Sequence, residues 1–225
     1  MRAQQKQNIK GISLIEVMVV LAIVGVVAGI GFPNFTKWQV DRKVRAHSEK
    51  IATVFTTATT QVERGSYPYT RVTIETDTST SPAEVKITAH GIKQDALSNL
   101  LNAGSSIDCT NTIFSSADEL ISYNLDGIKL FHLAGGGGSA ICFSKGGKYF
   151  KQHGSTDLQG NIAFDNNSSA PTNNYVTVCH LSSSKCDAVS KSFDDDYPTY
   201  LVRYSRFGLI TKYKWNIKTS DWSSQ

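Results

Sequence analysis

An apolar segment near the start of the chain, residues 12–32, constrains the fold more than any other feature. As a helix, a segment of about 21 residues spans roughly 30 Å, the hydrocarbon thickness of a bilayer. It contains a single charged residue, Glu16. A carboxylate in a membrane-spanning helix costs about 2.5–3.5 kcal/mol at mid-bilayer, so its presence there indicates a function.

Two ordinary explanations account for only part of this segment. A cleavable secretory signal has a shorter apolar core followed by an A-x-A-like site, whereas GIGFPNF follows here. A plain transmembrane anchor fits the length but leaves Glu16 unexplained. Lys6 and Lys10 precede the segment, and the positive-inside rule then places residues 1–11 in the cytoplasm and the body outside the inner membrane.

A third explanation is that the segment resembles the type III signal of type IV pilins and type II secretion pseudopilins. In that family a prepilin peptidase cuts after the glycine of a short basic leader, and glutamate is the fifth mature residue. Here the leader is MRAQQKQNIKG, which ends at Gly11, and the mature chain begins at Ile12, so that Glu16 is fifth. Pro33 is twenty-second, where pilins commonly have a helix-loosening proline. The family usually has Phe and often Thr where this chain has Ile12 and Ser13.

The resemblance implies a cleaved leader (1–11), a transmembrane assembly helix (12–33), and an amphipathic helix with a periplasmic head (34–225). It also implies methylation of the new terminus and pairing of Glu16 with the terminal ammonium of a neighbouring subunit. Breaking such a pair leaves an unpaired buried charge, which costs several kcal/mol. The implied partners are the prepilin peptidase, an inner-membrane assembly platform and other pilin subunits, and no cofactor is implied.

The rest of the chain predicts an α+β fold, with a long N-terminal helix packed on a mainly antiparallel sheet. Apolar residues at helical spacing continue to Arg64, so we expect one helix over 12–64, bent near Pro33. A second helix is expected within 91–104, and a strand at 71–75. Turn signals predict three hairpins: at the LDG of residues 125–127, at Gly146-Gly147, and at Phe207-Gly208 within 200–218.

Four cysteines in an exported segment indicate two disulfides, for which three pairings are possible. We favour Cys109–Cys142 with Cys179–Cys186, because the second pair closes a hairpin-sized loop. Free thiols are the alternative. No CxxC spacing is present, so a zinc site is not expected.

The head contains a second, looser resemblance. YVTVCHLSSSKC, which contains Cys179 and Cys186, and the following LVRYSRFGLIT are similar to FimT- and FimU-like minor pilins and H-type pseudopilins. Removing 11 of the 225 residues leaves 214, longer than most major pilins. Both observations favour a minor, low-copy subunit.

No catalytic set is recognisable in the sequence, and we expect a non-enzymatic protein. The five histidines are scattered, and neither H-E-x-x-H nor G-x-S-x-G occurs. The acidic stretches Asp165–Asn167 and Asp194–Asp196 contain oxygens suited to Ca²⁺, but neither fits an EF-hand loop. We expect them to form turns and predict no metal site.

A basic C-terminal stretch raises the possibility of nucleic-acid binding. It contains aromatic side chains between the cations Arg203, Arg206, Lys212, Lys214 and Lys218. Cations beside aromatic rings can hold phosphates and stack bases, and some FimT-like pilins are DNA receptors. Lys212, Lys214 and Lys218 share strand parity and would form a basic ridge. An ordinary half-exposed hairpin is the favoured alternative, since the net charge is only +4.

Our leading hypothesis is a minor type IV pilin that is anchored in the bacterial inner membrane and then assembled into a pilus or its tip. A type II secretion pseudopilin and a DNA-uptake receptor are the main alternatives, and adhesion is a third.

Overall fold

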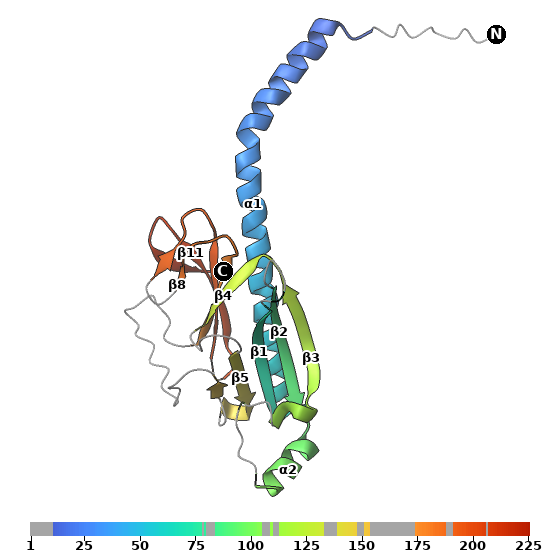
Figure 1. Cartoon of the computed structure of the whole chain (residues 1–225), viewed down its shortest axis with the longest axis vertical. Coiled ribbons are helices and arrows are strands. Elements are labelled where there is room, and N and C mark those ends of the chain that lie inside the picture. Colours follow the sequence, from blue (N-terminus) through green and yellow to red (C-terminus); the bar gives the residue numbers. More distant parts are fainter. Residues whose placement is uncertain are drawn as a thin grey trace, which may run out of the picture. The chain divides into compact units, whose positions relative to one another are not determined.

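The computed structural model describes residues 11–77, 79, 84–104, 109, 113–132, 139–147, 151–153, 174–187, 191–205 and 207–225. The chain divides into two compact units, residues 1–39 and 40–225. The first described helix, α1 (Leu14–Glu63), begins in the first unit and ends in the second (Figure 1). The predicted helix over 12–64 is therefore confirmed. Of residues 30–34 only the helical backbone is described, so the bend expected near Pro33 stays a prediction.

Within the second unit, α1 has one apolar face that is buried. Val44, Ile51, Phe55 and Ala58 are fully buried there, and the spacing is that of the predicted helical stripe. Gly65, with φ of +75°, follows the end of the helix, where its N–H donates to the Val62 carbonyl oxygen.

Within the described residues, two five-stranded antiparallel sheets build most of the rest of this unit, and two short strands near the second disulfide form a small third sheet. The first sheet has the order β3-β2-β1-β5-β6, and its strands are β1 (Tyr69–Asp77), β2 (Glu84–Ile92), β3 (Asp118–Leu125), β5 (Ser139–Ser144) and β6 (Lys151–His153). The second sheet has the order β12-β11-β10-β7-β4, and its strands are β4 (Ile128–His132), β7 (Tyr175–His180), β10 (Thr199–Tyr204), β11 (Ile210–Asn216) and β12 (Asp221–Ser224). The short elements are β8 (Cys186–Asp187), β9 (Ser192–Phe193), α2 (Gln94–Asn102), η1 (Ile113–Ser116) and η2 (Lys145–Gly147).

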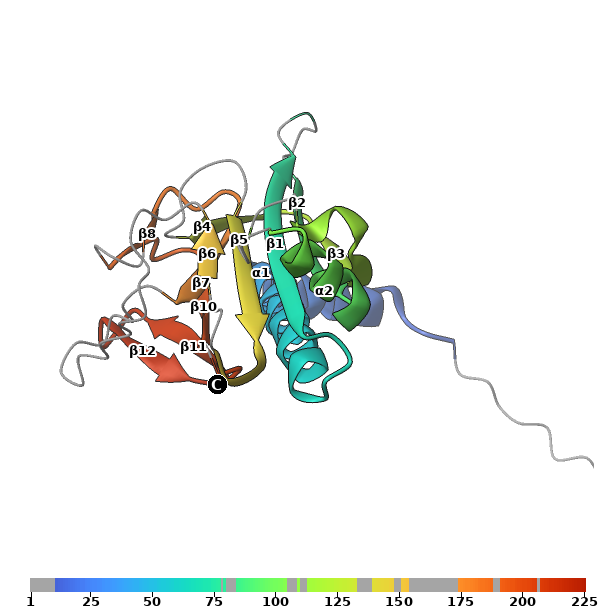
Figure 2. The ribbon, with the colours of Figure 1, turned by 90° about the horizontal axis from the view of Figure 1, so that it is seen from below.

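The strands form an arc that runs from β3 through β1, β5 and β10 to β12 (Figure 2). Phe55 of α1 packs on both sheets: its ring stacks on Tyr204 of β10 at 4.6 Å and meets Phe143 of β5 edge-on at 6.2 Å. Burial of aromatic side chains supplies much of the energy of such a core. The α+β class, with a helix packed on antiparallel sheets, is confirmed.

Most of the smaller sequence expectations are confirmed. The strand expected at 71–75 is part of β1, and the helix expected within 91–104 is α2. The final hairpin is formed by β10 and β11, and Gly208 in its turn has φ of +83°. The hairpin at Gly146-Gly147 is formed by β5 and β6.

The hairpin predicted at the LDG of residues 125–127 is wrong. β3 pairs with β2 in the first sheet, whereas β4 pairs with β7 in the second, so this turn carries the chain from one sheet to the other. Leu125 and Ile128 on either side are both buried in the core. The turn is held by α1, because Lys43 Nζ donates to Asp126 Oδ2 at 2.6 Å. Alternation around a turn predicts two strands but does not say which strands they pair with.

Candidate processing and assembly site

The start of α1 is a capped helix terminus. Gly11 and Ile12 precede it without regular structure, and Ser13 accepts the Glu16 N–H at its hydroxyl oxygen (3.2 Å) and at its carbonyl oxygen (3.1 Å). Ser13 is therefore the N-cap and Glu16 the third helical residue, the spacing of a capping box. A carboxylate in the first turn is also favoured by the helix dipole. Sequence reasoning missed this role of Glu16, although S-x-x-E ahead of an apolar run is a known signal for it.

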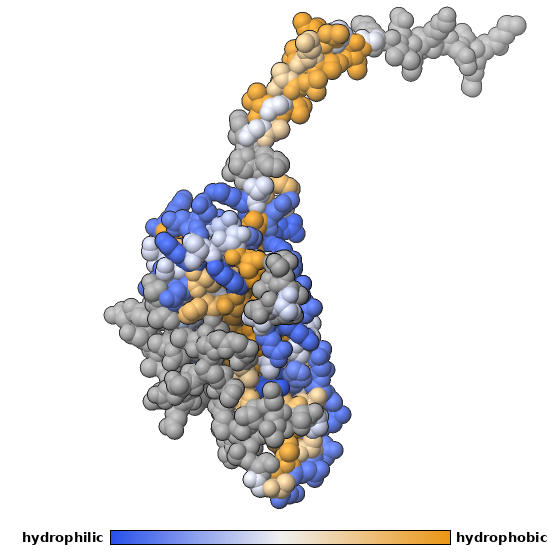
Figure 3. All heavy atoms as spheres, viewed as in Figure 1, coloured by the Kyte–Doolittle hydropathy of each residue, from blue (hydrophilic) through white to orange (hydrophobic). Residues whose placement is uncertain are grey.

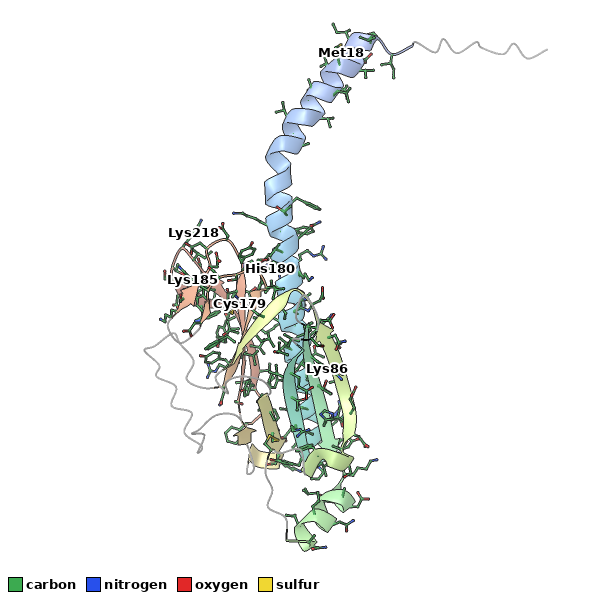
Figure 4. The ribbon with its side chains drawn as sticks, viewed as in Figure 1. Met18, Lys86, Cys179, His180, Lys185 and Lys218 are labelled. Atoms are coloured by element: carbon green, nitrogen blue, oxygen red, sulfur yellow. A yellow bond between two sulfur atoms is a disulfide. The ribbon has the colours of Figure 1, made fainter. Side chains whose placement is uncertain are left out.

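Behind this cap, the helix exposes apolar side chains on all of its faces. Leu14, Met18, Leu21 and Val26 are each more than 60% exposed. On the face seen in Figure 3 this part of the helix is mostly apolar, and Figure 4 shows Met18 projecting from it. A surface of this kind marks a site for lipid or protein contact. Gly25 and Gly29 lie on it, and a Cβ added at either would meet nothing within 4 Å. Their small size therefore leaves room for a partner rather than for a contact within this chain.

The two disulfides agree with the pairing favoured from the sequence. Cys109–Cys142 links the segment after α2 to β5, with the Cα atoms 5.8 Å apart. Cys179–Cys186 links the end of β7 to β8, with the Cα atoms 6.0 Å apart. Cys142 and Cys179 are fully buried, so both bridges lie in packed parts of the head. All four cysteines of the chain are paired.

The three lysines of the proposed basic ridge do not share one environment: two lie beside carboxylates of α1, and the third lies in a turn. Lys214 Nζ donates to Asp41 Oδ1 of α1 at 2.6 Å, and Lys212 Nζ lies 3.9 Å from Glu49 Oε1 of α1. Lys218 follows the end of β11, in the turn before β12, and Figure 4 places it at the outer edge of this region. The strand parity of Lys212 and Lys214 is thus confirmed, but both cations face carboxylates of α1.

The two arginines of that stretch do not join this ridge. Arg203 lies on β10 between Val202 and Tyr204, which face the core, so its side chain is on the opposite face of the strand. Arg206 lies outside the described residues. The opposite face of this sheet holds a cluster of aromatic side chains, in which Phe193, Trp215 and Trp222 are within 5.2 Å of one another by ring centroids.

Asp41 is the centre of the contact between α1 and the second sheet. Besides Lys214, its Oδ1 accepts the hydroxyl of Tyr200 at 3.1 Å. Burial and the nearby Asp41 carboxylate raise the pKa of Tyr200, so this hydroxyl stays protonated as a donor. The arrangement fixes the helix on the sheet.

His47 of α1 is buried beside the turn that joins the two sheets. Its Nε2 lies 3.7 Å from Asp126 Oδ1, and only 4% of the residue is exposed. Burial lowers the pKa of His47, with the positive charge of Lys50 lowering it further. His47 is thus held as a neutral side chain of the core.

A groove of 590 Å³ follows the face of α1 that the sheets leave open. It is lined by α1 and the start of β11, with Glu49, Thr53, Thr56, Thr60, Arg64 and Lys212 among its residues. The hydroxyls of Thr53 and Thr56 donate to carbonyl oxygens one turn back in the helix. The groove is lined by both polar and apolar side chains and contains both signs of charge.

Of the two acidic stretches considered for Ca²⁺, the structure describes Asp194–Asp196, which lies in a turn. Asp194 accepts the N–H groups of Ser184 and Asp196, as in a turn. These hydrogen bonds lower the pKa of Asp194. Asp165–Asn167 lies outside the described residues. In the described part of the chain, no three His, Cys, Asp or Glu side chains gather as metal ligands would.

Comparison with known families identifies the N-terminal segment. Residues 6–32 match the family described as the prokaryotic N-terminal methylation motif. No curated protein and no solved structure matches the chain. Within the described residues, no helix combines the length and the apolar character that a membrane crossing needs.

The motif and the fold together define the class of protein. The N-terminal segment carries a prepilin signal, and this motif, with a helix packed on antiparallel sheets, supports the type IV pilin and pseudopilin superfamily. The motif implies processing by a prepilin peptidase and assembly with other pilins. Within the superfamily, pilus subunits and secretion pseudopilins share these features.

Proposed function

We propose that this chain is a minor type IV pilin with a structural rather than an enzymatic role. It is cleaved after Gly11, anchored in the bacterial inner membrane by residues 12–33, and then assembled into a pilus or at its tip. The observation that carries the proposal is the all-round apolar surface of α1 from Leu14 to Val27, directly after a processing glycine. Such a surface needs lipid before assembly and neighbouring helices afterwards.

The proposed anchor includes residues 30–33, whose sequence is apolar and whose side chains are not described. Glu16 is the only acidic side chain in this anchor. In the filament its carboxylate pairs with the terminal ammonium of Ile12 in an adjacent subunit. That pair neutralises two charges in an apolar interior, where either charge alone is strongly unfavourable.

The choice of a minor pilin is supported by the size of the head and by the short loop closed by Cys179–Cys186. A type II secretion pseudopilin remains the alternative, because both features occur there too. A DNA receptor is less well supported. Lys212 and Lys214, two of its proposed contacts, already face Glu49 and Asp41, which reduces their attraction for phosphate.

The test is the location of the chain in cells whose pilus and type II secretion genes are deleted separately. A minor pilin is expected in the filament fraction sheared from cells. The chain should disappear from that fraction when the pilus genes are removed and stay in it when the secretion genes are removed. Presence that depends only on the secretion genes would contradict the proposal and favour the pseudopilin.

Two variants of Glu16 separate its charge from its place in the capped helix turn. Glu16→Gln keeps a residue suited to the third helical position but removes the charge, and Glu16→Ala removes both. We expect both variants to be absent from pili while staying folded, because each leaves the Ile12 ammonium unpaired. Glu84→Ala is the control, since Glu84 is exposed at the start of β2. Normal incorporation of Glu16→Gln would show that the carboxylate charge is not used.

A further inference from the structure

Two aromatic side chains stand at the end of the apolar part of α1. Phe35 and Trp38 stack with their ring centroids 5.7 Å apart and their planes 30° from parallel. They lie one helical turn apart, and both are about half exposed, at 52% and 51%. Lys37 lies between them in the sequence and is exposed as well. In a water-soluble domain such a pair would be expected to pack inward, whereas here it faces outward.

We infer that Phe35 and Trp38 anchor the subunit in the headgroup region of the outer leaflet of the inner membrane. The inference rests on the proposed function, because it requires residues 12–33 to span that membrane. Tryptophan is enriched at membrane interfaces, since its ring is apolar and its N–H is a hydrogen-bond donor. Lys37 adds a cation that reaches lipid phosphates, with its stem along the apolar surface. The partner is therefore a phospholipid headgroup layer.

The position of this pair sets the depth of Glu16. At 1.5 Å per residue, the helical distance from Glu16 to Trp38 is about 33 Å. The hydrocarbon core of a bilayer is about 30 Å thick. With Trp38 at the outer headgroups, Glu16 lies at the inner headgroups, close to the basic leader, rather than in the hydrocarbon. The membrane-bound subunit then avoids the cost of a charge at mid-bilayer.

This depth has a consequence for assembly. A subunit that waits in the membrane keeps Glu16 hydrated at the cytoplasmic interface. Its carboxylate enters an apolar environment only on joining the filament, where the ammonium of a neighbouring subunit pairs with it. An unpaired charge in hydrocarbon is avoided at both stages.

The first test measures the depth of Trp38 in the full-length chain. The protein is reconstituted in phosphatidylethanolamine–phosphatidylglycerol vesicles that contain lipids brominated either just below the headgroup or deep in the acyl chains. A Trp38→Phe variant supplies the signal of Trp215 and Trp222, and the difference between the two proteins is the signal of Trp38. We expect this difference signal to be quenched mainly by the shallow bromines.

The outcomes separate the two proposals. If the chain does not partition into the vesicles, both the membrane anchor and the inference fail. If it partitions but the Trp38 signal is quenched mainly by the deep bromines, or by neither lipid, the inference alone is overturned.

The second test asks whether the aromatic pair fixes the other end of the helix. Because all four native cysteines are paired, a Ser13→Cys variant adds one thiol for a polarity-sensitive fluorophore. We expect the fluorophore to report an interfacial environment, and a shift toward the apolar interior when Phe35 and Trp38 are both changed to Ala. Phe207→Ala, which removes an exposed aromatic ring of the head, is the matched control and should cause no shift. An unchanged signal in the Phe35→Ala/Trp38→Ala protein would contradict the inference.

Discussion

Among single residues, His47 has the environment with the clearest thermodynamic consequence. It is nearly fully buried, and its surroundings include Lys43 and Lys50 of α1 and Asp126 of the turn between the two sheets. Burial lowers its pKa in the folded state, so the unfolded chain binds more protons once the pH falls below the unfolded value of about 6.5. Stability is therefore expected to fall as the pH falls through that region.

This prediction is checked by denaturant unfolding of the full-length chain in detergent between neutral and mildly acidic pH. The loss of stability on acidification should be smaller in His47→Gln, which removes the titrating group but keeps a side chain of similar size. His90 and His180 also have lowered pKa values, so some pH dependence should remain. A variant that follows the wild-type pH profile throughout would contradict this account of His47.

Between elements, the attachment of α1 to the second sheet depends on Asp41. Its carboxylate accepts hydrogen bonds from Lys214 and Tyr200, and its side chain is only 30% exposed. Asp41→Asn should lower the free energy of unfolding by about 1 kcal/mol, with the loss smaller at high salt because the ion pair is partly screened.

A matched comparison for Asp41 is the Arg45–Glu49 pair on the same helix, whose side chains are 55% and 48% exposed. Arg45→Gln should change stability by only a few tenths of a kcal/mol, as is usual for exposed pairs. Equal effects of the two substitutions would mean that Asp41 has no special part in holding the helix.

The two disulfides are expected to stabilise the head unequally. In the chain-entropy description, stabilisation grows with the length of the closed loop, which gives about 4 kcal/mol for Cys109–Cys142 and about 2 kcal/mol for Cys179–Cys186. The sequence separations are 33 and 7 residues. Replacing the first pair by serines should lower the thermal midpoint more than replacing the second, as calorimetry would measure. The reverse order would show that local packing, rather than loop length, decides their contributions.

At the level of elements, the sequence predicted what depends on neighbours along the chain. The extent of α1 follows from apolar spacing, and the turn at Gly208 from its glycine. The features that the sequence did not predict are contacts between segments that are distant along the chain. Nothing near Lys214 indicates that Asp41 faces it, and nothing in the LDG turn indicates that β3 and β4 belong to different sheets. The capping role at Glu16 was also missed, but it does not depend on a distant segment. Ser13 and Glu16 are only three residues apart, and their spacing in the sequence already indicated a capping box.

For the whole molecule, the described structure has a closed head and an open assembly segment. In the head, α1 and the two sheets bury Phe55 and its neighbours. In the first unit, the start of α1 leaves its apolar side chains uncovered. The exposed apolar side chains at the start of α1 need to be covered by lipid or by other subunits. This requirement is the physical reason for proposing that the chain assembles with other subunits.

The most direct test of this account is the amino-terminal sequence of the mature protein, taken from cells with and without the prepilin peptidase. We predict a chain that begins at Ile12, with a methyl group on its terminal nitrogen, only where the peptidase is present. A mature chain that retains residues 1–11, or that is cut elsewhere in either strain, would contradict it.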